Sequence, residues 1–558
     1  MKKIKHIATL ALLVPVALLS SCSKEYLDRT PTTALDTELV LNDVDMIPST
    51  VVGTMHMMYS SSFSGKYATV IGDIMTDMVS SIRGSNGSFK EMEEWNINQS
   101  TPDVETLWGA GYQIAAASAR TIEAAKRKLA GDTTALTSSQ KNNLRSAIAA
   151  SLVIKVYAEY FLAQYFCVDI NVDKHDYAFS NNFRMPGSNP VKVGLILLKD
   201  RALGNEEAAN MSTLESTYEF MEKEIAEAIE YFQASGSSKF TLAPEERFYP
   251  TLCAAYLVQA RVFLAQHKYQ QADEAAENAL RNLPGSANET LISNPEALLN
   301  AYGETLSTED IWSINYTNQD NLSANSLQNL FGSYGFSPSD KAVGLIKSGD
   351  IRKALYFTPK QKLPEGVTSY CLKYPNDNSV FNVPVFRVPE IYLIQAEARA
   401  AGKFGNANEA LLKVIGARDS IVGKHADPEQ QMISRYGLTD ATMMQVILDE
   451  NAREFLCEGH RWYDLRRNGV RLSREGSRDD NEKFPTHFED YPLSTFAFPV
   501  PYGETSTEQW KKGRGTYADG RQDSKNWQNN AWDDKQGDSY SATVTLPVEG
   551  GDYERNEN

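Results

Sequence analysis

An internal repeat in the second half of the chain limits the folds that the sequence can adopt. The five residues that begin at Tyr256 match the five that begin at Tyr392, and after a turn residues 268–275 match residues 403–410, with the offset changed by one residue. Each copy has the pattern of helix, tight turn and helix, with alanines on the inner faces, and small side chains let two helices approach closely. Because one such pair cannot bury its apolar face alone, the pairs must stack. The repeat therefore predicts a mainly α-helical body.

Apolar periodicity elsewhere predicts further helices and places a third pair before the repeat. The predicted helices span about 104–129, 141–166 and 214–232. Thr213 is a suitable N-cap for the last of them, and helices 141–166 and 213–233 could pair across a long insertion. The pairs resemble tetratricopeptide helix pairs. We therefore expect a mainly α fold with a few short strands, such as the run from Asp310 to Tyr316.

The N-terminus indicates export followed by lipid attachment. The first five residues carry three lysines, and residues 7–20 form an apolar run that is too short to span a bilayer. Leu19, Ser20 and Ser21 stand directly before Cys22 at the end of this run, and the four residues resemble a lipobox. We predict a lipoprotein signal peptide over residues 1–21, a lipid anchor at Cys22 and a polar tether over residues 22–45. An ordinary signal peptide with a chance cysteine is the alternative. No later stretch reaches about 18 consecutive apolar residues, so the sequence indicates no other membrane anchor.

The charge balance and the cysteines exclude several classes of partner and site. The chain has 72 Asp+Glu against 55 Lys+Arg, a formal net charge of −17 at pH 7, and the signal peptide contains three of the lysines. So acidic a surface disfavours nucleic acid and anionic lipid headgroups as partners. The body has four cysteines, Cys167, Cys253, Cys371 and Cys457. We expect them to be small buried side chains, and we expect Cys253 and Cys457 to lie within helices. Without a Cys-x-x-Cys pair they indicate neither a zinc site nor a redox motif.

The search for catalytic and metal-binding motifs favours binding over catalysis. The sequence has no Gly-x-Ser-x-Gly elbow, no His-Glu-x-x-His, no P-loop and no dinucleotide fingerprint. The segment from Asp169 begins like a calcium loop, but Lys174 stands where glycine is needed and Ser180 where glutamate is needed. We therefore expect no catalytic residue, no metal site and no cofactor. Acidic pairs are plentiful, so glycosidase chemistry stays an alternative.

The densest polar cluster, residues 450–467, has a catalytic and a structural interpretation. The catalytic one would use His460 with Glu458 or Asp464. In the structural one, a helix ends at Gly459 while alternating arginines and carboxylates pair and the aromatic side chains pack. The structural interpretation fits the alternation of charges better, and we favour it.

The same cluster belongs to an ordered set of motifs. Residues 453–466 contain Arg-Glu-Phe followed by Glu-Gly-His-Arg-Trp-Tyr-Asp-Leu-Arg, which closely resembles the C-terminal signature of the SusD/RagB family of Bacteroidetes outer-membrane lipoproteins. Residues 22–28, 349–352, 384–387 with Glu390, and 498–501 resemble further landmarks of that family. The set covers residues 22 to about 502 in the family's order, and only the tail departs from the family's short ending.

The resemblance implies a fold, a role and partners. It implies one SusD-like α-helical domain over residues 46–502, with tetratricopeptide-like pairs and a loop-rich face. An N-terminal part would cover about 46–235, a C-terminal part about 250–502, and a polar tail 503–558. It implies a protein that is no enzyme, captures an oligosaccharide at the cell surface and delivers it to a SusC-like TonB-dependent outer-membrane transporter. Peptide capture, a surface glycan hydrolase and a purely structural scaffold are the alternatives.

Candidate ligand contacts lie in the irregular segments. Aromatic rings stack on sugar faces, and Asn and Arg side chains bond hydroxyl groups. The candidates are Arg83, Trp95, Asn96, Asn98, Tyr316, Asn318, Phe331 and Tyr334. The alternative for each is packing within a loop, and Trp95 could instead plug the end of the helix over 104–129, near Trp108. Trp312 alternates with isoleucines in the strand-like run, so we assign it to the core.

Overall fold

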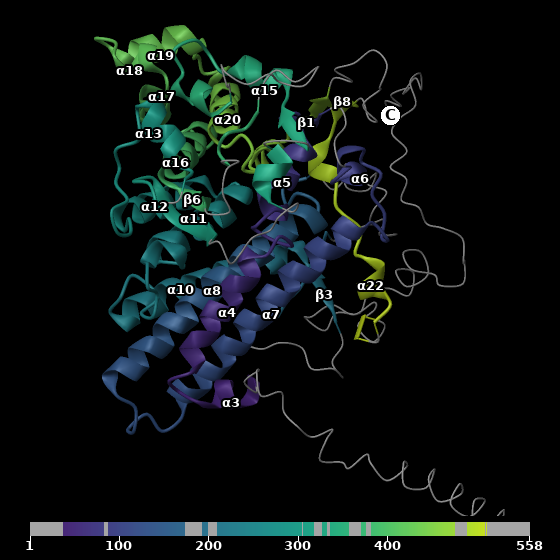
Figure 1. The fold of residues 1–558 in the computed structure, drawn as a ribbon, viewed down its shortest axis with the longest axis vertical. Helices are drawn as coiled ribbons and strands as arrows, with labels where there is room; N and C mark the ends of the chain where they lie inside the picture. Colours follow the sequence, from purple (N-terminus) through teal and green to yellow (C-terminus); the bar gives the residue numbers. More distant parts are fainter. Residues whose placement is uncertain are drawn as a thin grey trace, which may run out of the picture.

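The computed structural model describes residues 37–82, 87–172, 192–198, 209–303, 305–316, 326–331, 335–356, 370–374, 381–474, 488–507 and 509–510. Seven long helices form a series in which each helix lies against the next (Figure 1). They are α7 (Pro102–Ala130), α8 (Ser138–Phe166), α10 (Leu214–Ser235), α11 (Leu252–Ala265), α12 (Tyr269–Arg281), α16 (Val388–Gly402) and α17 (Ala407–Arg418). The fold is mainly α-helical, as predicted.

Further helices, 3-10 turns and short strands surround this series. The other helices are α3 (Thr37–Asn42), α4 (Thr50–Tyr59), α5 (Tyr67–Ile74), α6 (Lys90–Glu93), α13 (Pro295–Asn300), α14 (Leu327–Asn329), α15 (Asp340–Leu345), α18 (Ser420–Gly423), α19 (Pro428–Tyr436), α20 (Met443–Glu454), α21 (Arg461–Arg467) and α22 (Tyr502–Thr505). The 3-10 turns are η1 (Ile47–Ser49), η2 (Glu246–Phe248), η5 (Ile351–Leu355) and η6 (Leu493–Thr495). The strands pair antiparallel, β1 (Val79–Ser81) with β5 (Phe336–Pro338), β2 (Val193–Ile196) with β3 (Met211–Thr213), β4 (Asp310–Tyr316) with β6 (Phe381–Arg387), and β7 (Leu472–Arg474) with β8 (Phe488–Tyr491). β4 is the strand that the sequence predicts.

The predicted helix pairs are α8 with α10, α11 with α12, and α16 with α17. In α12 the buried side chains are all alanines, at positions 272, 275, 276 and 279, and α12 packs between α11 and α16. The hydroxyl of Thr213 accepts the backbone N–H of Ser216 at 3.0 Å, so the predicted N-cap of α10 is confirmed. The periodicity of apolar residues and the capping residue thus predicted the positions of these helices in the sequence.

α8 is the central helix, because α4, α7, α10 and α11 all pack against it. In the described part of the chain it is the one helix that by length and composition alone could cross a membrane, and 94% of its apolar window is buried inside the protein. A helix that is apolar all round is expected in such a position. Its two buried charged residues, Lys155 and Glu159, pair with each other at 3.0 Å, and Lys155 also pairs with Glu224 of α10 at 2.6 Å.

The turn between α20 and α21 corrects two predictions. α20 ends at Glu454, so Gly459 does not terminate it, and Cys457 lies in the turn with a φ of +66° and not in a helix. Gly459 is needed for another reason. Its φ is +79°, and a Cβ atom there would lie 2.9 Å from the carbonyl oxygen of Ala68 in α5. α5 in turn presents Gly72, whose added Cβ would lie 2.1 Å from the carbonyl oxygen of Gly459. The backbones of α5 and this turn therefore touch.

The other core predictions hold. Trp312 is fully buried and packs edge-on against Tyr157, with ring centroids 5.5 Å apart. All four cysteines of the body are buried thiols.

The first part of the predicted polar tail packs on the body. α22 lies beside α7, where the indole N–H of Trp108 donates to Glu504 at 3.3 Å, and Trp510 is buried. The packed body therefore extends past residue 502. Residues 511–558 lie outside the described residues.

Two glycines of α7 test the close contact between α7 and α8. A Cβ atom on Gly111 would lie 2.7 Å from the side chain of the buried Leu162, whereas one on Gly109 would meet nothing within 4 Å. We expect Gly111→Ala to lower the free energy of unfolding by about 1–3 kcal/mol through overpacking. Gly109→Ala should raise it by up to about 1 kcal/mol, because alanine favours the helix. Denaturant unfolding of both variants measures this, and equal effects would contradict the proposed helix contact.

Candidate functional site

The densest polar cluster of the sequence folds into the interior. α20 places Glu450 and Glu454 one helical turn apart on one face, and the following turn supplies Glu458. Their exposed fractions are 0%, 2% and 9%. Because an ionised carboxylate is costly to bury without partners, each of the three is paired with arginine or lysine side chains.

Glu454 is the centre of this charge network. One of its carboxylate oxygens lies 2.7 Å from Arg387 and 2.8 Å from Arg418, and the other lies 3.0 Å from Arg418 and 3.2 Å from Arg352. Burial alone would raise the pKa of Glu454. Arg418, Arg387 and Arg352 outweigh that effect and hold the pKa well below its usual range. Glu454 is therefore ionised at any physiological pH.

The arginines around Glu454 bind further carboxylates. Arg352 also pairs with Asp350 and Glu450, each at 2.7 Å, Arg418 with Glu309 at 2.7 Å, and Arg387 with Glu458 at 2.8 Å, while Lys373 reaches Glu458 at 2.5 Å. The network thereby joins α20 to η5, α17, β6 and the segment 370–374. These elements are far apart in the sequence, so the network fixes their mutual positions.

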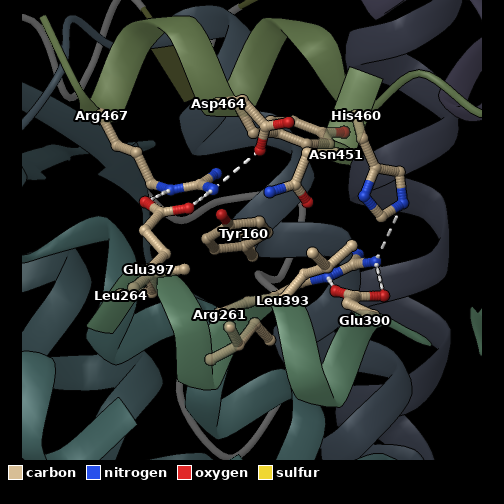
Figure 2. Close-up of a pocket in the computed structure, with 12 residues that line it drawn as sticks. Tyr160, Arg261, Leu264, Glu390, Leu393, Glu397, Asn451, His460, Asp464 and Arg467 are labelled. Atoms are coloured by element: carbon tan, nitrogen blue, oxygen red, sulfur yellow. Dashed lines mark hydrogen bonds and ion pairs between the residues drawn. The ribbon is translucent and has the colours of Figure 1, made fainter. Parts of the chain in front are cut away.

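A small cavity lies below α21, beside the charge network (Figure 2). Two ion pairs line it. Arg261 binds both oxygens of Glu390 at 2.5 and 2.9 Å, and Arg467 binds both oxygens of Glu397 at 2.6 and 2.5 Å. The cavity volume is about 20 Å³, which is room for about one water molecule. It cannot hold a sugar ring.

His460 lines this cavity as a packing residue. Its ring stacks on Phe455, with centroids 4.1 Å apart, and one ring nitrogen lies 3.4 Å from the guanidinium of Arg261 (Figure 2). Burial and the nearby arginines hold its pKa well below the usual value, so the imidazole is neutral. The two carboxylates of the catalytic interpretation are engaged elsewhere, Glu458 by Arg387 and Asp464 by Arg467. These contacts favour the structural interpretation.

The cluster also binds the N-terminal part of the chain. The backbone N–H of Gly459 donates to Asp73 of α5 at 3.1 Å, and burial raises the pKa of Asp73 to about 7. Arg461 makes two bonds to Asp77, at 3.0 and 3.1 Å. The indole N–H of Trp462 donates to the end of α8 at 2.9 Å. α21 therefore holds both parts of the body together.

Three of the predicted ligand contacts, Arg83, Asn318 and Tyr334, lie outside the described residues. Three more are buried. Trp95 has an exposed fraction of 2% and packs against Phe496, Tyr491 and Trp462, with ring centroids 4.8, 5.2 and 6.0 Å away. This favours the packing alternative, although its neighbours are these rings and not Trp108, which lies against Tyr112 and Phe166.

Tyr316 and Phe331 are the other two buried candidates. Tyr316 stacks on Phe381 at 5.1 Å and its hydroxyl donates to the carbonyl of Tyr59. Phe331 stacks on Tyr374 at 6.0 Å. Of the candidates that the structure describes, Asn96 is exposed and Asn98 is half-buried.

The described residues next to Arg83 and Tyr334 lie together. Ile82, which precedes Arg83, bonds through its N–H to the carbonyl of Gly335, which follows Tyr334, at 3.0 Å. The segment 370–374 touches this corner at its first residue, which packs with Ile82, and its last residue lies between Phe331 and Phe381. The segment 370–374 thus lies against Ile82, the described residue before Arg83, at one end, and against Phe331 and Phe381 at the other.

Sequence reasoning missed three partners of the charge network. Glu309, Lys373 and Arg418 lie outside the motifs that the sequence analysis quotes, and nothing local marks them as buried charges. The only available signal was a charged residue on an otherwise apolar face, as at Arg418 in α17. Among the described residues, no group of three or more His, Cys, Asp or Glu side chains is placed to hold a metal ion.

Comparisons with known proteins add to this description. Residues 339–558 match the model of the SusD family. A SusD superfamily protein from Bacteroides thetaiotaomicron matches with a TM-score of 0.67 at 18% identity, over 84% of this chain and 98% of its own. One from Bacteroides vulgatus matches with a TM-score of 0.66 at 19% identity, over 83% and 97%. A structure described as a SusD-like carbohydrate binding protein from Bacteroides vulgatus matches with a TM-score of 0.61 at 17% identity, over 78% and 86%. No curated protein matches the chain. The SusD-like fold is thus confirmed.

Arg418 tests the charge network. We expect Arg418→Met to lower the free energy of unfolding by about 3–5 kcal/mol, because Glu309 and Glu454 would lose a shared buried partner. The control is Arg281→Met, since Arg281 pairs with Glu277 on the surface, with exposed fractions of 65% and 40%, and should change stability by less than about 1 kcal/mol. Chemical denaturation measures both, and a small effect at Arg418 would show that the network is dispensable.

Proposed function

We propose that this chain, whose residues 339–558 match the SusD family, is a SusD/RagB-type outer-membrane lipoprotein that captures an oligosaccharide and delivers it to a SusC-like TonB-dependent transporter. The fold carries this proposal. It is shared, over most of each chain, with a Bacteroides protein described as carbohydrate binding, and residues 339–558 match the SusD family. The strongly acidic composition agrees with a ligand that is neither nucleic acid nor an anionic membrane surface.

The interior chemistry supports binding over catalysis. The carboxylates of the C-terminal signature are buried and held by arginines and lysine, and His460 is neutral and stacked. A glycosidase needs two carboxyl groups that flank the substrate. The cavity beside the signature has room for about one water molecule. The signature is therefore best suited to holding the fold.

We place the ligand face at the corner that the segment 370–374 supports. Arg83, Asn318 and Tyr334 border that corner in sequence, and we propose them as contacts, together with the solvent-accessible Asn96 and Asn98. Asn96 follows α6, whose Glu93 accepts the N–H of Ser81 in β1 at 2.9 Å. The buried rings of Tyr316 and Phe331 would support this face from below.

Ligand binding by the full mature chain tests the proposal. We expect selective binding of oligosaccharides on a glycan array and no binding of a peptide library. Tyr334→Ala should weaken the affinity for the selected glycan by about 1–3 kcal/mol through loss of ring stacking, with an unchanged melting temperature.

The matched control for this experiment is Trp95→Ala. It should lower the free energy of unfolding by about 3–5 kcal/mol and leave the affinity of the folded fraction near that of the wild type. Selective peptide binding would replace the glycan proposal by peptide capture, and release of cleaved sugars would indicate a hydrolase.

The lipid anchor is tested separately. We expect Cys22→Ala to leave the protein folded and to release it from the outer membrane, because a single acyl-cysteine would be its main attachment. Cell fractionation in a strain that lacks the proposed SusC-like transporter measures how much of the variant stays with the outer membrane. Recovery of the variant in the outer-membrane pellet after a high-salt wash would indicate a second anchor.

A further inference from the structure

The α22 segment, residues 501–507, lies on the N-terminal end of α7 (Figure 1). Its Glu504 accepts the indole N–H of Trp108 of α7 at 3.3 Å. A Cβ atom on Gly503 would overlap the carboxylate of Glu105 of α7, so the segment and the helix are in direct contact. α22 therefore holds its first residue in a fixed position on the surface.

That first residue, Tyr502, carries an exposed ring. The exposed fraction of Tyr502 is 64%, and no other Phe, Trp or Tyr among the described residues is exposed to a comparable extent. Within the described part of the chain its ring forms no ring contact and its hydroxyl no hydrogen bond. Trp95, Tyr316 and Phe331 are buried, whereas Tyr502 keeps its ring in water. A flat apolar face of this kind is what a stacking ligand covers.

Three carboxamide side chains lie on the stretch of chain to which Tyr502 is bonded. The N–H of Tyr502 donates to the carbonyl of Gln99 at 2.9 Å, and Asn96 and Asn98 precede Gln99 after α6. The side-chain oxygen of Asn98 accepts the N–H of Ser100 at 2.8 Å. Its amide nitrogen, like the whole carboxamides of Asn96 and Gln99, bonds to no other described residue. These groups can donate to and accept from the hydroxyl groups of a ligand.

The charges beside this surface are negative. Asp103 and Glu105 lie in the first turn of α7, and Glu504 lies in α22. Glu105 is exposed and forms no ion pair with a described residue. An unpaired surface carboxylate repels an anion. The surface therefore suits a neutral sugar better than a uronic acid or a sulfated sugar.

We propose that Tyr502, Asn96, Asn98 and Gln99 form a binding subsite for a neutral sugar unit. The ring of Tyr502 stacks on the apolar face of the sugar, and the carboxamides bond to its hydroxyl groups. This subsite rests on the proposed function, because it extends the ligand face from Asn96 and Asn98 to α22. The fixed backbone of α22 lowers the entropy that the ring loses on binding.

The sequence analysis did not single out Tyr502. It lies at the border of the polar tail, and nothing in the sequence near it indicates that residues 96–99 are its neighbours. The backbone bond to Gln99 joins residues about 400 positions apart in the sequence. Only the folded chain brings this ring to the carboxamides.

A glycan array with neutral, uronic-acid and sulfated oligosaccharides tests the subsite on the full mature chain. We expect the wild type to select neutral oligosaccharides. In calorimetry with the oligosaccharide of strongest signal, Tyr502→Ala should weaken the affinity about 5- to 100-fold through loss of ring stacking. Its melting temperature should stay that of the wild type, because the ring is exposed. Tyr502→Trp keeps a flat ring and should recover most of the lost affinity.

Leu39→Ala is the matched control, because Leu39 of α3 has an exposed fraction of 66% and lies outside the subsite. It should change neither affinity nor melting temperature. Full affinity in Tyr502→Ala, or selection of acidic oligosaccharides by the wild type, overturns the subsite and leaves glycan capture standing. A wild type that binds no oligosaccharide contradicts the proposed function and the subsite together. Unchanged glycan affinity with weaker co-purification of the transporter would assign the ring to a protein contact instead.

A second measurement observes the ring directly. In protein labelled with 3-fluorotyrosine, the fluorine NMR signal that Tyr502→Phe lacks belongs to Tyr502. We expect this signal to shift when the selected oligosaccharide is added, because a stacked sugar replaces water at the ring. A signal that stays in place while the oligosaccharide binds would show that Tyr502 is not in contact with it.

Discussion

The structure depends on one buried carboxylate, that of Glu454, and on the three arginines that hold it. An ion of this kind is expensive to remove from water, and it becomes tolerable only when several charged hydrogen bonds form at once. Arg352, Arg387 and Arg418 come from η5, β6 and α17, so those elements must all be in place before the charge is balanced. The C-terminal end of α20 therefore fixes the positions of these three elements relative to one another.

That constraint reaches the N-terminal part through α21 and α5. Gly459 and Gly72 let two backbones touch, Asp73 and Asp77 receive the N–H groups of the signature, and Trp462 bonds to the end of α8. α8 is held in turn by the helices around it. Loops that carry a ligand face work best on a rigid support, and the segment 370–374 is attached to this support through Lys373 and Tyr374.

The sequence around the candidate ligand residues could not predict whether their aromatic side chains are exposed or buried. Trp95, Tyr316 and Phe331 lie in segments rich in polar and small residues, which is why the sequence marked them as exposed stacking rings. Their burial is decided by rings from distant segments. Trp95 meets Trp462 and Phe496, and Phe331 meets Tyr374. An aromatic side chain that stacks on a sugar and one that fills a core look alike until its neighbours are known.

The sequence by itself determined the helices, their pairing and the resemblance to the SusD family. Periodicity, the alanine faces of the repeat and the Thr213 cap act between residues a few positions apart, so they can be read along the chain. Only the tertiary structure decided which charges meet in the network and why Gly459 must be glycine. Those outcomes depend on contacts between residues far apart in the sequence, and the energies of buried charges and close backbones exist only once these residues are brought together.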